Sequence, residues 1–202
     1  MLLNKFEFFL MNNPLRGFLQ KMVEIPRIKS IAVVPVNGKV LEIGCGSGRG
    51  TQLIQEHFLP SATVGIDLDP KMIEIAKQKT NKVEADFQVA DVMNLPFEIN
   101  TFDAVFDFGI IHHVPNWKKA IEQIVRVTKS GGLLVLEDLS IETFKSPVGM
   151  LARTFLDHPY GQMFKQSEFV QQLEKCGTEI LAEKTYTNFG TIRYFVVVAR
   201  KK

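Results

Sequence analysis

A glycine-rich turn and an acidic residue stand where two short apolar runs of the sequence end. The turn Gly44-Cys45-Gly46-Ser47-Gly48 directly follows the run 39–43, and Asp67 ends the run 62–67. A glycine turn that follows a strand and opens a helix presents unpaired backbone N–H groups and the positive end of the helix to a ligand. An acid at the end of the next strand can accept hydrogen bonds from ribose hydroxyls. These two groups together predict a nucleoside site.

A second acid, Asp91, ends the next apolar run, and the loop 94–97 follows it. Its carboxylate is suited to accept a hydrogen bond from an exocyclic adenine amine, while the backbone N–H of Val92 donates to a ring nitrogen. The simpler alternatives are that Asp91 caps a turn and that Asp67 helps Asp69 to start a helix. Because three successive strand ends each supply a suitable group, the pattern favours one adenosine ligand.

Two adjacent histidines, His112 and His113, follow the apolar run 102–108. Imidazole titrates near neutral pH, so either ring is a candidate general base, and the alternative is that the pair only packs a turn. His158 and Tyr160 are further candidates for contacting a second substrate. The four histidines and two cysteines lack the linear spacing of a zinc site, so we expect no metal.

Alternating strand and helix patterns must position these groups. A rhythm of this kind predicts an α/β fold with a doubly wound, mostly parallel sheet. The expected strands are 39–43, 62–67, 86–90, 102–108 and 133–139, the last entered through a turn at Gly131-Gly132; the expected helices are 51–59, 70–79, and one capped by Asn116 with the inner stripe Trp117, Ala120, Ile121, Ile124, Val125 and Thr128.

The end of the sequence departs from this alternation. A helix over 167–176 ends at Gly177, and two strands, 180–187 and 192–200, are joined by the short turn 188–190. A tight turn joins only antiparallel strands, so the sheet is expected to finish with an antiparallel hairpin.

Two segments lie outside the core pattern. Residues 1–29 read as two short helices broken at Asn13-Pro14, with the exposed-looking apolar residues Leu3, Phe6, Phe9 and Leu10. Residues 142–166 form a long aromatic connection of the kind that often serves as a lid. We therefore expect an N-terminal helical cap over 1–37 and one main domain over 38–202, with an acceptor lid at 142–166.

The composition excludes several classes of partner. The chain has 202 residues, a net charge of +2 and two cysteines, so neither a nucleic acid nor a disulfide framework is expected. No secretory signal and no run of about 18 apolar residues is evident, which predicts a cytoplasmic protein without stable membrane insertion. A monomer or a homodimer fits equally well.

Five segments carry a family resemblance: 42–48, 65–70, 90–91 with 95–97, 102–106 and 131–136. In order, they resemble the motifs of class I (Rossmann-like) S-adenosylmethionine-dependent methyltransferases. Within that class the chain looks most like the small-molecule methyltransferases, a group that includes enzymes methylating quinone rings on carbon. The likeness covers about residues 38–139 well and the rest by topology only. It implies a seven-stranded sheet whose last strand is antiparallel.

The resemblance also implies roles for the matching residues. Glu42 and the glycine turn would hold the methionine portion of the cofactor, Asp67 the ribose, and Asp91 with Val92 the adenine. Met72 would pack on the ribose and adenine, and backbone carbonyls of 108–110 would contact the amino group. The complete implied cofactor set is Glu42, Gly44, Cys45, Gly46, Gly48, Asp67, Leu68, Met72, Asp91, Val92, Phe108 and Gly109, with His112, His113 and Tyr160 as candidate catalytic residues.

The implied chemistry is direct transfer of the methyl group to a small, partly apolar acceptor. A sulfonium methyl is already activated, so orientation and desolvation can supply most of the acceleration, and a base is needed only if the acceptor must lose a proton. Two alternatives stay open: a dinucleotide-dependent oxidoreductase, whose Gly-x-Gly-x-x-Gly spacing this turn lacks, and a non-catalytic protein that binds the cofactor.

Overall fold

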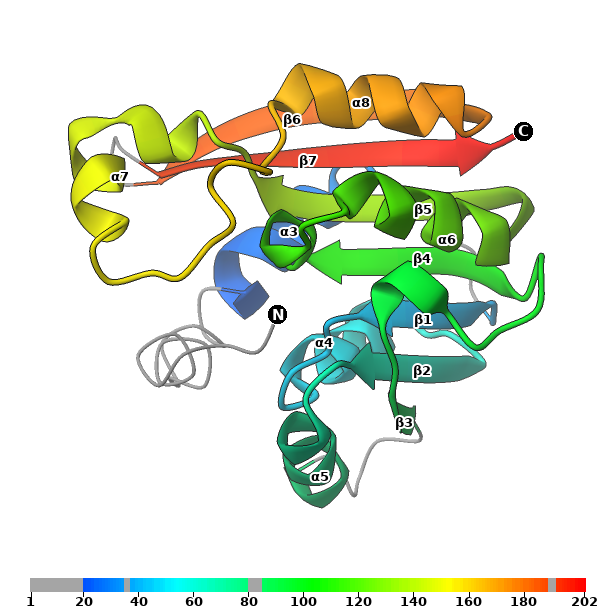
Figure 1. Cartoon of the computed structure of the whole chain (residues 1–202). Coiled ribbons are helices and arrows are strands. Elements are labelled where there is room, and N and C mark those ends of the chain that lie inside the picture. The colour runs from blue at the N-terminus through cyan, green and yellow to red at the C-terminus, as the bar shows by residue number, and fades with distance from the viewer. Residues whose placement is uncertain (1–19, 35–36, 80–84, 189–191) are drawn as a thin grey trace.

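Seven strands form one sheet in the computed structural model, which describes residues 20–34, 37–79, 85–188 and 192–202 (Figure 1). The strands lie in the order β3-β2-β1-β4-β5-β7-β6. Neighbours from β3 to β5 are parallel, and β7 is antiparallel to both β5 and β6. Their bounds are β1 Lys39–Ile43, β2 Ala62–Asp67, β3 Ala85–Val89, β4 Phe102–Phe108, β5 Thr128–Leu139, β6 Thr178–Asn188 and β7 Ile192–Lys201.

The predicted α/β sheet with an antiparallel C-terminal hairpin is confirmed. The chain runs outward from β1 through β2 to β3, and then returns to place β4 on the other side of β1. Strand order therefore reverses between β1 and β4. In open parallel sheets a crevice forms at the carboxyl ends of the strands beside such a reversal, and ligands bind there.

Helices cover both faces of the sheet (Figure 1). Side chains alternate along each strand, so Leu41 and Ile43 of β1 pack with α6 and α8, whereas Val40 packs on the opposite face with α3 and α4. The stripe predicted on α6 is buried, including Trp117 and Thr128. The helices are α3 Ile25–Lys29, α4 Arg49–Phe58, α5 Pro70–Lys79, α6 Trp117–Val127, α7 Pro147–Ala152 and α8 Gln166–Lys175, and the single turns are η1 Gln20–Glu24, η2 Val92–Asn94, η3 Ile111–His113 and η4 Thr143–Lys145.

One predicted boundary is wrong by five residues: β5 begins at Thr128, not at Leu133. Thr128 pairs with Phe102 and Leu133 pairs with Ala104, so the residues between them bulge out of an otherwise continuous pairing. This bulge contains both glycines of the predicted turn. The buried Thr128 hydroxyl also donates to the carbonyl of Ile124, 2.6 Å away, which ties the strand directly to the end of α6.

The N-terminal prediction is tested only in part. The first expected helix, its break at Asn13-Pro14 and its apolar residues lie outside the described residues. The part that is described, η1 and α3, packs onto the sheet, because Ile25 and Ile28 are buried in the same apolar cluster as Val40. A separate cap over 1–37 stays a prediction.

The connection 142–166, which was expected to be a lid, contains η4 and α7. It carries apolar side chains both towards the core and towards solvent. Phe144 and Phe164 are buried inward. Met150, Leu151 and Phe155 are exposed outward, with more than half of each side chain's surface accessible.

None of the helices in the described part of the chain has both the length and the apolar character that a membrane span requires.

Candidate functional site

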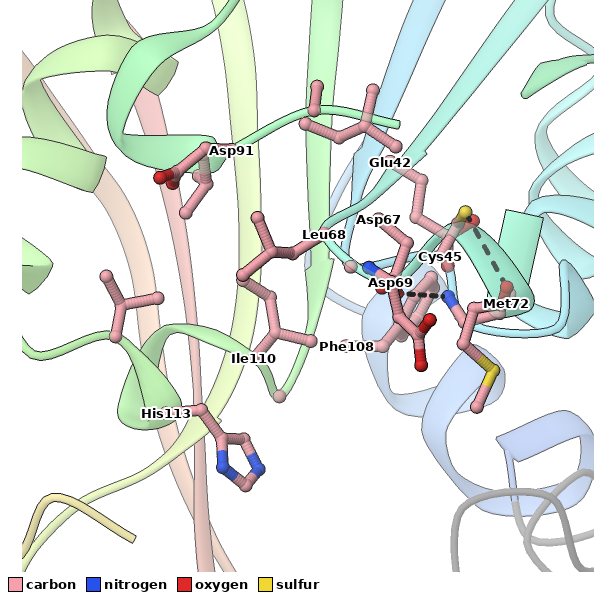
Figure 2. A pocket seen from close by; sticks show the side chains of 18 of the residues that line it. Glu42, Cys45, Asp67, Leu68, Asp69, Met72, Asp91, Phe108, Ile110 and His113 are labelled. Carbon is pink, nitrogen blue, oxygen red and sulfur yellow. Dashed lines mark hydrogen bonds between the residues drawn. The ribbon is translucent and has the colours of Figure 1, made fainter. Parts of the chain in front are cut away.

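A cavity of about 170 Å³ opens at the carboxyl ends of β1, β2 and β4, where strand order reverses. Figure 2 shows side chains from these three strands and from the turns after β3 and β4 around it. Most of the predicted cofactor residues line this one cavity: Glu42, Gly44, Cys45, Gly46, Asp67, Leu68, Met72, Asp91, Val92, Phe108 and Gly109. Gly48 is not among the lining residues; its N–H closes the turn on the Cys45 carbonyl at 2.9 Å.

The glycine turn has a left-handed backbone conformation at Gly44 and is hydrogen-bonded to β2. Gly44 has φ +62°, and a Cβ there would collide with the Ile110 side chain. The N–H of Cys45 donates to the Ile66 carbonyl at 2.8 Å, and the N–H of Gly46 donates to Oδ2 of Asp67 at 2.9 Å. The turn and the acid at the end of β2 are thus one hydrogen-bonded unit, although they were identified as separate motifs.

Asp67 binds backbone on two sides. Besides Gly46, its Oδ1 accepts from the N–H of Asp69 at 2.9 Å, so the alternative role in starting α5 is also fulfilled. Burial raises the pKa of Asp67 above its ordinary value. Each carboxylate oxygen offers two acceptor directions, so hydroxyl groups of a ligand in the cavity can still be bound.

Glu42 is a buried carboxyl group on the floor of the cavity, at the carboxyl end of β1. The hydroxyl of Thr51 on α4 donates to it, and its carboxyl occupies the place where a Cβ of Gly50 would stand. Burial raises the pKa of Glu42 to about 8. The group is therefore protonated at neutral pH in the ligand-free protein, and a cation placed beside it would favour its ionised form.

Asp91 both caps a turn and lines the cavity. Its Oδ1 accepts from the N–H of Met93 at 2.8 Å, which starts η2. The alternative of a turn cap is therefore correct for one oxygen, while the residue still contributes to the cavity wall together with the buried Val92.

The three candidate catalytic residues lie at different depths. His113 lines the cavity, whereas His112 is buried behind it, with Nδ1 against the Asp138 carboxylate of β5. Tyr160 does not line the cavity; its hydroxyl donates to the Leu156 carbonyl at 3.1 Å, and its ring stacks on His158 with centroids 5.5 Å apart.

Several lining residues were not found from the sequence, among them Gln20, which reaches the wall from η1. Ile110, which belongs to the segment 108–110 that the resemblance implied, also lines the cavity. Arg49 begins α4 directly after the glycine turn, a place from which a side chain could have been expected to reach a ligand at the helix N-terminus. Gln20 gave no local signal, because only the packing of η1 brings it there.

Comparisons with known proteins agree with this geometry. A family model described as a methyltransferase domain matches residues 41–136. The chain is 33% identical over 171 residues to the demethylmenaquinone methyltransferase of Staphylococcus epidermidis, covering 79% of this chain and 70% of that protein.

Two further matches show how far the sequence similarity and the structural similarity extend. The phthiotriol/phenolphthiotriol dimycocerosates methyltransferase 1 of Mycobacterium ulcerans is 35% identical over 107 residues, 52% of this chain, and the chain spans only 40% of that relative's length. A solved S-adenosylmethionine-dependent methyltransferase from Mesorhizobium loti superposes with a TM-score of 0.75 at 17% identity, covering 91% of this chain and all of that one (100%).

The fold, the glycine turn anchored by an acid, and the sequence identity to the staphylococcal protein lead to one family. The chain belongs to the class I S-adenosylmethionine-dependent methyltransferases.

Proposed function

We propose that this protein transfers a methyl group from S-adenosylmethionine to a small, partly apolar acceptor by in-line displacement. The observation that carries the proposal is the convergence of Glu42, the glycine turn, Asp67 and Asp91 on one cavity at the reversal of strand order. Two relatives, a demethylmenaquinone methyltransferase and a phthiotriol/phenolphthiotriol dimycocerosates methyltransferase, support an acceptor with apolar character.

The cavity fits this cofactor part by part. The protonated Glu42 is a buried group that a ligand ammonium would ionise, which suits the methionine end. Asp67 would bind the ribose hydroxyls, and Asp91 with the N–H of Val92 would bind the adenine edge. The buried Met72 would pack beside the sugar. When bound, the cofactor supplies an activated methyl group; the chain's residues hold it and exclude water.

The acceptor would enter on the side of Ile110 and His113. Among the three candidate catalytic residues, only His113 borders the cavity directly. His112 and Tyr160 would act through it or through the connection 142–166, since one is buried behind it and the other stacks on His158. In-line transfer needs the acceptor atom opposite the sulfonium, so the packing of these rings would set the orientation of the acceptor.

Thermal-shift titration distinguishes the proposal from its main alternative. We expect S-adenosylhomocysteine to raise Tm in a saturable, concentration-dependent manner and NAD to leave it unchanged, because ligands stabilise a protein only by binding its folded state. A methyl-transfer assay with naphthoquinone and phenolic acceptors then tests catalysis. Stabilisation by NAD alone would contradict the proposal, and tight cofactor binding without transfer to any acceptor would favour a non-catalytic role.

The binding of S-adenosylhomocysteine should depend on pH through Glu42. The ligand-free carboxyl has a pKa of about 8, so below that pH it must lose a proton to pair with the ligand's ammonium. Affinity should therefore rise with pH between 6 and about 8, by at most about tenfold per unit, and then level off. Calorimetry in buffers of different ionisation enthalpy measures the released proton. Glu42→Gln should bind weakly with no such slope; a flat profile for the unaltered protein would refute the pairing.

Glu42→Gln should also stabilise the ligand-free protein. An acid whose pKa is raised by folding favours the folded state at low pH and progressively loses that advantage as pH rises from 4.5 towards 8. Removing the ionisable group should therefore increase the free energy of unfolding at pH 8 by about 1–3 kcal/mol, with little change at pH 5. Urea unfolding at the two pH values checks this, and an equal effect at both would contradict it.

A further inference from the structure

Three of the four histidines in the chain meet beside the cavity. His112 and His113 lie on η3, and His158 lies on the connection that follows α7. Their ring centroids are 4.1 Å (His112–His113), 4.3 Å (His113–His158) and 5.0 Å (His112–His158) apart. Three ring nitrogens, one from each histidine, lie within 4.8 Å of one another.

The innermost ring is oriented by a buried acid. Asp138 contacts Nδ1 of His112, and its other oxygen accepts from the backbone N–H of the same residue at 3.1 Å. A carboxylate behind a histidine in this way is the usual outer shell of a metal ligand.

The ring of His158 is buried as well. Within the described part of the chain, Nδ1 of His113 is buried with no hydrogen-bond partner, which is costly unless a ligand satisfies it.

We propose that His112, His113 and His158 form a binding site for a divalent transition metal of the zinc type. Linear spacing predicted no such site, because His158 reaches the pair only through the fold. Tetrahedral zinc with bonds of about 2.1 Å requires ligand nitrogens about 3.4 Å apart. The rings must therefore draw closer by about 1 Å, and the segment 153–165, which has turns but no regular helix or strand, allows His158 to do so.

The remaining coordination position would face the cavity, since His113 is the member of the trio that lines it. Three histidines with one open position are typical of sites that bind a substrate or a water molecule. On this arrangement, which here rests on the proposed methyl transfer, the metal would bind an oxygen of the acceptor and orient it toward the cofactor.

Cobalt titration of tag-free, chelator-treated protein tests the site without cofactor or acceptor. We expect one Co²⁺ per chain with the visible absorption of tetrahedral coordination, displaced by Zn²⁺. His113→Ala and His158→Ala should each weaken binding by at least about tenfold, and Asp138→Asn by about 10–100-fold. His57→Ala, which changes the remaining histidine on α4, is the matched control and should bind as the unaltered protein does.

Circular dichroism and Tm establish that each variant is folded, and His158→Gln is a second, milder change at the same position. Absence of stoichiometric Co²⁺ binding, or equal binding by the folded His158 variants, would overturn the metal site. Neither result would affect the cofactor titrations, so the two proposals fail independently.

Discussion

Replacing Asp67 by alanine is expected to weaken the binding of S-adenosylhomocysteine by about 100- to 10,000-fold. Two ribose hydroxyls would lose a charged acceptor, at about 1.5–3 kcal/mol each, and every 1.4 kcal/mol is a factor of ten in Kd. The variant also removes the acceptor for the N–H of Gly46, so the glycine turn loses its tie to β2. Isothermal titration calorimetry gives the affinity directly.

Asp86→Ala is the matched control, because Asp86 is an exposed acid on the neighbouring strand β3. It should leave the affinity within a factor of two. If Asp67→Ala were folded and bound the ligand as tightly as this control, the ribose assignment would be wrong, and with it the reading of the cavity as an adenosyl site.

Gly44→Ala should lower the free energy of unfolding by about 2–5 kcal/mol. The left-handed backbone at this position costs a residue with a Cβ about 1–2 kcal/mol, and overlap with Ile110 adds about 1–3 kcal/mol. A shift of the backbone at position 44 or of the Ile110 side chain would also narrow the cavity, because both residues line it. Cofactor affinity should therefore fall together with stability. Chemical denaturation with and without S-adenosylhomocysteine measures both effects.

Gly46→Ala separates the cost of the left-handed backbone from the cost of the steric overlap. Its φ is +52°, but a Cβ there would meet nothing within 4 Å, so only the backbone cost should appear. The double variant Gly44→Ala/Ile110→Ala should recover part of the loss by removing the overlap. Equal destabilisation by Gly44→Ala and Gly46→Ala would contradict the steric explanation.

The cofactor side of the site could be predicted from the sequence because its signals are local. A glycine turn after a strand and acids at strand ends occupy fixed places in a parallel sheet, so residue order alone brings Glu42, Asp67 and Asp91 to one edge. The start of β5 was misplaced because Gly131-Gly132 reads as a turn, whereas the structure accommodates both glycines in a bulge.

The histidine trio could not be predicted in the same way. His158 comes from a connection without regular periodicity, so its position depends on the packing of Phe144 and Phe164 into the core. One signal was overlooked. Asp138 is an acid within the long apolar run of β5, and a buried acid requires a partner, which here is His112.

The placement of β7 between β5 and β6 has a consequence for synthesis of the chain. All strands that shape the cavity are complete by residue 139, yet β5 gains its second neighbour only when residues 192–201 have emerged. During that interval the nascent polypeptide carries an unpaired edge rich in leucine and valine, which is a template for intermolecular pairing. Ribosome-bound chains halted between these points should therefore recruit chaperones, and variants that weaken β7 should be lost mainly to aggregation.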